Sequence, residues 1–208
     1  MLRRHVMALL ALAGLLASPV LRAEAIAPDV FVKQLSDEVL AAVKADKGIQ
    51  GGDLSRIRAL VDTKVMPHVN FTRMVASAVG PLWRSATPEQ KARLQEEVKM
   101  LLVNTYSGAL TQVKNQTIDV KPLRGGADRD QLVVRSEVRS QGEPVQLDYR
   151  LEKSGDSWKI YDVNVGGFWI VEAYRGQFAP ELSQGGIDGL IAALAAKNKA
   201  QAASAPKS

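Results

Sequence analysis

The sequence predicts an α+β fold in which a curved, four-stranded antiparallel sheet carries a layer of helices on its apolar face. Apolar residues recur at helical spacing in the first half of the chain and again near its end. Between residues 117 and 163 they alternate with polar residues instead, as in strands that bury one face. The 208 residues are 46% hydrophobic and 24% charged, which is typical of a globular domain. We therefore expect one domain over residues 26–196, with helices stacked on the sheet.

The helices of the first half have recognisable starts. Apolar residues between 31 and 43 lie on one side of a predicted helix, and Asp53 and Asn70 are typical N-cap residues for two more. The clearest start is Thr87-Pro88-Glu89-Gln90, a capping box with proline at the first helical position. The helix that begins there is expected to reach about residue 113.

The strands follow this long helix. Four strands are expected at residues 117–120, 132–138, 145–151 and 158–163, with glycine-containing turns between them. Within 145–151, we expect odd-numbered residues to face the helices and even-numbered residues to face water, because side chains alternate across a sheet.

Helical spacing returns after the strands, over residues 168–178 and again over 187–194, with Pro180 between the two segments. From residue 197 the sequence consists almost entirely of Ala, Gln, Lys and Ser. We therefore expect a disordered tail over residues 197–208.

The first 25 residues have the features of a secretory signal peptide. Arg3 and Arg4 precede an apolar run at residues 6–17, and Ala23-Glu24-Ala25 fits the small-x-small cleavage pattern. The apolar run is too short to span a bilayer. The chain contains no cysteine, which excludes a lipobox anchor and disulfides. These features predict a soluble periplasmic protein.

Charge and chemistry exclude several functions. The net charge is +5, but three basic residues lie in the leader, and the remaining excess of about +2 is too small for a nucleic-acid-binding face. His68 is the one histidine beyond the leader, so we expect no two-histidine metal site. Asp148 has the parity of the charged face. Asp162 shares the predicted face of Trp158 and Ile160, and remains open as a functional acid.

Large apolar side chains are the feature that stands out. They either fill a solid core or line a pocket between the sheet and the helices, and periodicity cannot separate these, because both need the same inward face. Three hypotheses remain at this point: an apolar binding site, an α+β enzyme that uses an inward Asp or His68 as a base, and a periplasmic binding module with a solid core.

An ordered set of motifs resembles the MlaC family, the periplasmic phospholipid carriers also called toluene-tolerance auxiliary proteins. The motifs are Asn70-Phe71-x-Arg73-Met74, Trp83, Thr87-Pro88-Glu89-Gln90, Leu101-Leu102-x-x-Thr105-Tyr106-x-x-Ala109-Leu110, Trp158-x-x-Tyr161-Asp162-Val163 and Tyr174-Arg175-x-Gln177-Phe178. The resemblance covers about residues 28–196. The sequence departs from the family at Gly166 and Trp169, where the family often has an acidic residue and a serine.

The resemblance implies a deep hydrophobic cavity that takes phospholipid acyl chains while the head group stays near solvent. It implies a carrier, not an enzyme, with phospholipid as ligand and no cofactor or metal. The implied partners are an outer-membrane lipoprotein–porin complex and the lipid-binding subunit of an inner-membrane ABC transporter, between which lipid moves to maintain outer-membrane asymmetry. The expected lipid-binding residues are Met66, Phe71, Met74, Val75, Leu102, Tyr106, Leu110, Val134, Leu147, Tyr149, Leu151, Val163, Val165, Trp169 and Tyr174.

Overall fold

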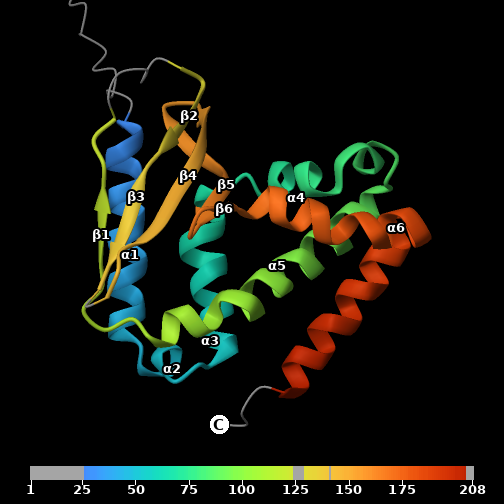
Figure 1. Ribbon diagram of the computed structural model, residues 1–208, viewed down its shortest axis with the longest axis horizontal. Coiled ribbons are helices and arrows are strands. Elements are labelled where there is room, and N and C mark those ends of the chain that lie inside the picture. The colour runs from blue at the N-terminus through green and yellow to red at the C-terminus, as the bar shows by residue number, and fades with distance from the viewer. Residues whose placement is uncertain (1–25, 124–128, 141, 205–208) are drawn as a thin grey trace, which may run out of the picture.

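A computed structural model describes residues 26–123, 129–140 and 142–204 of the chain (Figure 1). The expected signal peptide over residues 1–25 lies outside the described residues, as does the end of the expected tail, 205–208. Within the described ranges, no helix is both long enough and apolar enough to cross a membrane.

The helices begin where the capping residues predict. They are α1 (Pro28–Ala45), α2 (Lys47–Gln50), α3 (Leu54–Leu60), α4 (Phe71–Val79), α5 (Pro88–Thr111) and α6 (Ile170–Ser204), with a π-helical segment (Val61–Val65) and two 3-10 turns (Met66–His68 and Gly80–Arg84) flanking α4. In the turn that follows each cap, Asp53 accepts from two backbone N–H groups and Asn70 accepts from one. Thr87 and Gln90 form the predicted capping box at the start of α5.

Helix α6 bends at a position other than the predicted one. Pro180 lies inside the helix, and the chain changes direction at Gly186, where φ is 60° and ψ is −152°. Glycine adopts this backbone conformation readily because it has no Cβ atom. The two predicted helical segments are therefore present, but the break between them falls at Gly186.

The predicted disordered tail is wrong for residues 197–204, which continue α6. Asn198 is only 2% exposed. Its side-chain amide donates to the backbone oxygen of Glu97 at 3.0 Å and to the carboxylate of Glu97 at 2.8 Å. Asn198 continues the buried stripe of Leu190 and Leu194 at helical spacing. The sequence did not indicate that this stripe continues, because its last member, Asn198, is polar.

The sheet has six strands among the described residues, not the four that were predicted. They are β1 (Thr117–Val120), β2 (Gln131–Val134), β3 (Ser136–Arg139), β4 (Val145–Ser154), β5 (Ser157–Val165) and β6 (Phe168–Trp169). These six strands pair with one another only in antiparallel fashion, in the order β1-β3-β4-β5-β6, and β2 also pairs with β4.

Each of the two additional strands has an identifiable cause. The strand predicted at 132–138 divides at Arg135, whose carbonyl accepts from the N–H of Lys121 at 2.9 Å, while the next N–H, that of Ser136, donates to Asp148 at 3.0 Å. The second cause is the Gly166–Gly167 turn. Both glycines have positive φ, which allows β6 to fold back onto β5 before α6 begins.

The register between β4 and β5 shifts by one residue at Tyr161. Asp162 pairs with Arg150, whereas Ile160 pairs with Leu151, so Tyr161 forms a β-bulge. Directly paired residues point to the same side of a sheet. The prediction that Asp162 shares a face with Ile160 is therefore wrong, because simple alternation does not allow for the extra residue.

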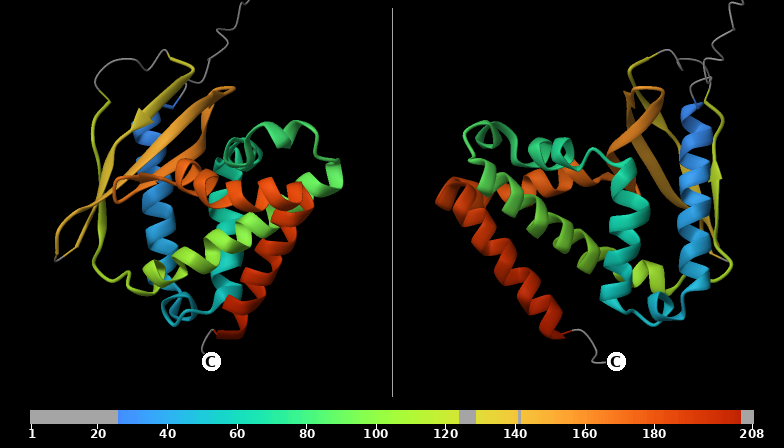
Figure 2. Two further views of the ribbon diagram at one scale, coloured as in Figure 1. Left: turned by 45° about the vertical axis from the view of Figure 1, so that its right-hand side comes forward. Right: turned by 180° about the vertical axis from the view of Figure 1, so that it is seen from behind.

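The two faces of the sheet differ in character. We call inner the face that carries Leu147, Tyr149, Leu151, Val163 and Val165, and outer the face that carries Asp148, Arg150, Asp162, Asn164 and Trp169. Helix α1 lies along the sheet in both views of Figure 2 and packs on the inner face. The predicted helix layer on the apolar face is thus present.

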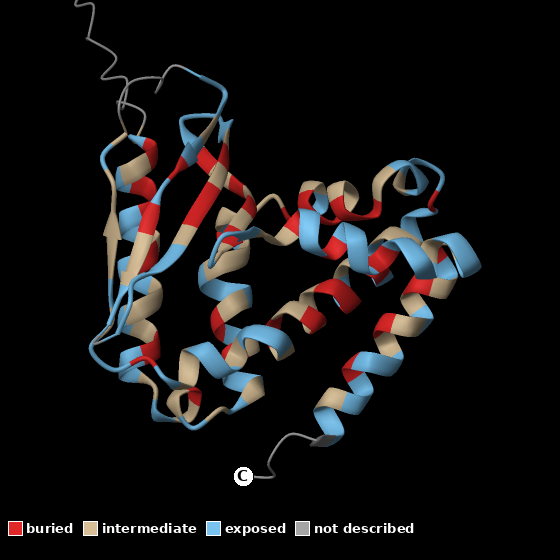
Figure 3. Cartoon of the chain, viewed as in Figure 1, coloured by how far each residue is buried: buried red, intermediate tan, exposed pale blue. Residues whose placement is uncertain are grey.

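The buried residues, red in Figure 3, form three clusters of contacting side chains. The first joins α4, α5 and α6, the second joins α1 to the inner face of the sheet, and the third joins α1, α2 and α3 to the end of α5. Helix α5 packs chiefly against α6, α3 and α4. The apolar side chains between the clusters are consequently only partly covered.

Candidate functional site

Burial along the inner face of the sheet falls steadily from one end to the other. Leu151 is 0% exposed and Tyr149 is 9% exposed, whereas Leu147 and Val165 further along are half-buried. At the far end, Phe168 pairs with Val165 and therefore shares its face, yet it is 75% exposed. The chain itself thus covers one end of this apolar face and leaves the other open.

Helix α1 closes the covered end. Burial raises the pKa of the Tyr149 hydroxyl above its usual value of 10.0, although the nearby side chains of Ser36 in α1 and of Ser136 oppose that shift. The indole N–H of Trp158 donates to the backbone oxygen of Ile26 at 2.9 Å. These contacts and the packing of Phe31 and Val32 hold α1 and the preceding Ile26 against the sheet, so this end is a packed core.

Helix α5 presents a partly exposed apolar side chain near the start of α6. Tyr106 is 38% exposed, and its hydroxyl lies in hydrogen-bonding distance of the hydroxyl of Tyr174, which also contacts Thr105. Burial raises the pKa of Tyr174 above 10.0. Tyr174 therefore anchors α6 to α5, while Tyr106 remains partly open to solvent.

The predicted lipid-binding residues divide into two groups by burial. Seven are buried within the clusters: Phe71, Met74, Val75, Val134, Tyr149, Leu151 and Tyr174. The others keep part of their surface exposed: Met66, Leu102, Tyr106, Leu110, Leu147, Val163, Val165 and Trp169. A pocket for a large apolar ligand requires residues of the second kind, because fully packed side chains have no free surface to offer.

Trp169 does not lie with the other strand residues of the predicted set. It pairs with Asn164, which places it on the outer face, and the guanidinium of Arg150 stacks 3.9 Å from the centre of its ring. Phe168 occupies the inner face in its place, and sequence reasoning missed it by assigning this segment to a helix. The glycine pair at 166–167 was the signal that could have indicated a hairpin.

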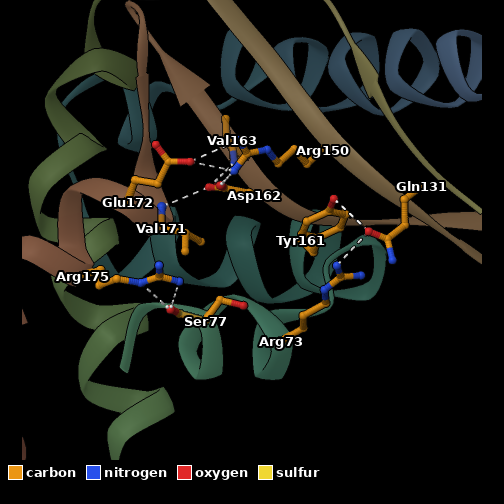
Figure 4. Close-up of polar contacts among 10 residues, drawn as sticks. All are labelled: Arg73, Ser77, Gln131, Arg150, Tyr161, Asp162, Val163, Val171, Glu172 and Arg175. Atoms are coloured by element: carbon orange, nitrogen blue, oxygen red, sulfur yellow. Dashed lines mark hydrogen bonds and ion pairs between the residues drawn. The ribbon is translucent and has the colours of Figure 1, made fainter. Parts of the chain in front are cut away.

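Asp162 lies on the outer face and is 1% exposed. It accepts from the N–H of Val171 at 3.0 Å, at the start of α6, and from Arg150 at 2.9 Å (Figure 4). Arg150 also contacts Glu172 at 3.2 Å. Burial raises the pKa of Asp162, although Arg150 and the hydrogen bonds from the backbone N–H groups of Val171 and Val163 oppose that shift. All its oxygens are engaged, so its arrangement is that of a helix cap.

The other candidate bases are also engaged in the fold. Asp148 lies on the outer face as its parity predicts, but it is buried, and it accepts from Gln146 as well as from the N–H of Ser136. His68 packs edge-on against Phe31, with ring centres 5.6 Å apart. In the described part of the chain, no group of three potential metal ligands lies together.

An open cleft of about 610 Å³ lies over the outer face. Lys121, Arg135, Asp148 and Trp169 are among the residues that line it, so its walls are largely polar. The enclosed apolar cavity expected from the resemblance stays a prediction.

Residues 33–196 match the family model described as MlaC protein. The chain belongs to the MlaC family. It is 30% identical over 188 residues to toluene tolerance protein ttg2D of Pseudomonas putida, a match that covers 90% of this chain and 85% of that protein. It is 25% identical to the intermembrane phospholipid transport system binding protein MlaC of Haemophilus influenzae, over 79% of this chain and 78% of that one.

A solved protein of similar fold carries a ligand. The phospholipid-binding protein of Ralstonia solanacearum, solved in complex with a phospholipid, is 45% identical to this chain and has a TM-score of 0.82. The match covers 85% of this chain and 99% of the Ralstonia chain. The resemblance found in the sequence motifs is thus confirmed at the level of the family, and this family is one of phospholipid-binding transport proteins.

Proposed function

We propose that this chain is a periplasmic phospholipid carrier that holds acyl chains against the uncovered end of the inner face. The observation that carries the proposal is the 45% identical Ralstonia structure, which contains a phospholipid and matches 85% of this chain. The burial gradient supports it, since a contiguous set of partly exposed apolar side chains is typical of a binding surface.

The residues proposed to contact the acyl chains are those with free apolar surface between the three clusters. From the sheet they are Leu147, Val163 and Val165, and from the helices they are Met66, Leu102, Tyr106 and Leu110. Tyr149 and Leu151 form the closed end of the inner face. The buried residues of α4 pack with those of α5 in the first cluster.

The energetics suit a carrier. Two acyl chains contain roughly 30 methylene groups, and each is worth about 0.8 kcal/mol when removed from water, so about 25 kcal/mol opposes loss of the lipid into the aqueous space. In a membrane the same chains are already buried, so transfer from carrier to membrane is close to neutral. The carrier therefore needs no covalent chemistry, which agrees with the structural roles of Asp148 and Asp162.

The wider role that we propose follows the family. The carrier exchanges lipid with an outer-membrane lipoprotein–porin complex and with the lipid-binding subunit of an inner-membrane ABC transporter, and thereby maintains outer-membrane lipid asymmetry. The name of the Haemophilus relative, an intermembrane phospholipid transport system binding protein, supports this placement.

The test begins with protein purified from a periplasmic extract without detergent. Mass spectrometry of a lipid extract should find phospholipid at about one equivalent per chain, and the intact mass should show the loss of about 23–25 residues. Lipid-free protein that also fails to extract labelled phospholipid from vesicles would favour a solid-core binding module. A full-length chain in the membrane fraction would contradict the periplasmic location.

A further inference from the structure

Phe168 is the most exposed large apolar side chain among the described residues, and a rigid frame presents it. The N–H of Gly166 donates to the backbone oxygen of Gln146 at 2.9 Å, and the N–H of Gly167 donates to the side chain of Asn164 at 2.9 Å. Both ends of the turn are therefore fixed to the sheet, and the exposure of Phe168 is not the result of a loose loop.

The surroundings of the turn are open. A Cβ atom placed on either Gly166 or Gly167 would meet no atom within 4 Å. Trp169, the residue after Phe168, lies on the outer face, where it stacks on Arg150. Because successive side chains of a strand point to opposite faces, Phe168 points to the inner face. The described chain leaves 75% of Phe168 exposed there.

Phe168 extends the open end of the inner face. It pairs directly with Val165, and Val145, an odd-numbered residue of β4, adds a second side chain on this face that is 48% exposed. Leu147 next to them is half-buried. An exposed phenylalanine at the margin of a partly covered apolar surface is unfavourable in water unless a ligand covers it.

We propose that Phe168 is an acyl-chain contact at the open end of the inner face and that it slows the release of bound phospholipid. The inference rests on the proposed function, and the occupant follows from continuity with the apolar face and from the phospholipid in the Ralstonia relative. The ring covers the part of the chains that Leu147 and Val165 leave exposed, so its removal returns that part to water.

The test compares Phe168→Ser with Phe168→Leu and with Val133→Ser. Val133 is a matched control, because it is 40% exposed but pairs with Arg150 on the outer face. Each full chain is loaded with fluorescent phosphatidylglycerol, and release into an excess of phosphatidylethanolamine–phosphatidylglycerol vesicles is followed. Release from Phe168→Ser should be at least tenfold faster than from the unaltered chain, whereas Phe168→Leu and Val133→Ser should stay within about twofold.

Two results would overturn the assignment while leaving the proposed function intact. Unchanged release from Phe168→Ser, with lipid content preserved, would mean that the ring does not touch the chains. Slower release would mean that Phe168 engages the acceptor membrane or a partner protein instead. An unaltered chain that takes up no lipid would overturn the proposed function itself. Thermal denaturation of each variant confirms that it is folded.

Discussion

Tryptophan substitutions at the two ends of the inner face should have opposite effects. Leu151, at the closed end, is 0% exposed and lies in the same cluster as Trp158 and Ile160. Overpacking a site of this kind costs about 1–3 kcal/mol. For a domain of this size, each kcal/mol lowers the melting temperature by about 2–4 °C, so Leu151→Trp should lower it by about 2–12 °C.

Val165, at the open end, is half-buried and has room on its exposed side. Val165→Trp should change the free energy of unfolding by less than about 1 kcal/mol, because the new ring can extend into space that the chain does not fill. The ring would occupy that space in place of a lipid chain, so we expect at least half of the bound phospholipid to be lost.

The assay measures melting temperature and lipid content for both variants. Melting is measured on delipidated protein, since a bound ligand raises the apparent stability and would mix the two effects. If Val165→Trp strongly destabilises the chain and keeps its lipid, the open end is a packed core and the site lies elsewhere. If Leu151→Trp loses lipid without loss of stability, the burial gradient has been assigned in the wrong direction.

Three further variants test polar contacts. Arg150→Ala should cost about 2–4 kcal/mol in urea denaturation, because it leaves the buried carboxylate of Asp162 without its cation. Burial raises the pKa of Asp162, so the folded chain binds this proton up to a higher pH than the unfolded chain does. The stability of the unaltered chain relative to Asp162→Asn should therefore fall as the pH rises from below 3.8 through the raised pKa, and urea midpoints across that window check this. Asn198→Ala should cost about 1–3 kcal/mol by removing both hydrogen bonds to Glu97, and an unchanged melting temperature would mean that residues 197–204 fray in solution.

The features that could be predicted from the sequence are those that neighbouring residues determine. The capping box at Thr87 needs only the next three residues, and the caps at Asp53 and Asn70 likewise act on the turn that follows. Alternation of apolar and polar side chains located the strands for the same reason, because one buried face imposes a period of two.

The features that could not be predicted depend on pairing between distant segments. The division of the second predicted strand requires the carbonyl of Arg135 to meet Lys121, and the face of Asp162 depends on its register with Arg150. Phe168 rather than Trp169 faces inward because these residues form a hairpin with β5. Their spacing in the sequence predicted the start of a helix instead. In the candidate site, periodicity identified the inward side chains, but only the three-dimensional packing separates those that are covered from those that are not.

The bulge at Tyr161 has a consequence for how the length of this strand can vary. The ring of Tyr161 stacks on Arg73 of α4, 3.6 Å from its guanidinium carbon, while the adjacent Asp162 caps α6, so the bulge gives both helices an anchor on one face of the strand. Deletion of Tyr161 would leave Ile160 and Val163 on the inner face. Deletion of one residue from the regular part of the strand would move every side chain on one side of it to the wrong face. We therefore expect relatives that differ in length within this strand to differ at the bulge.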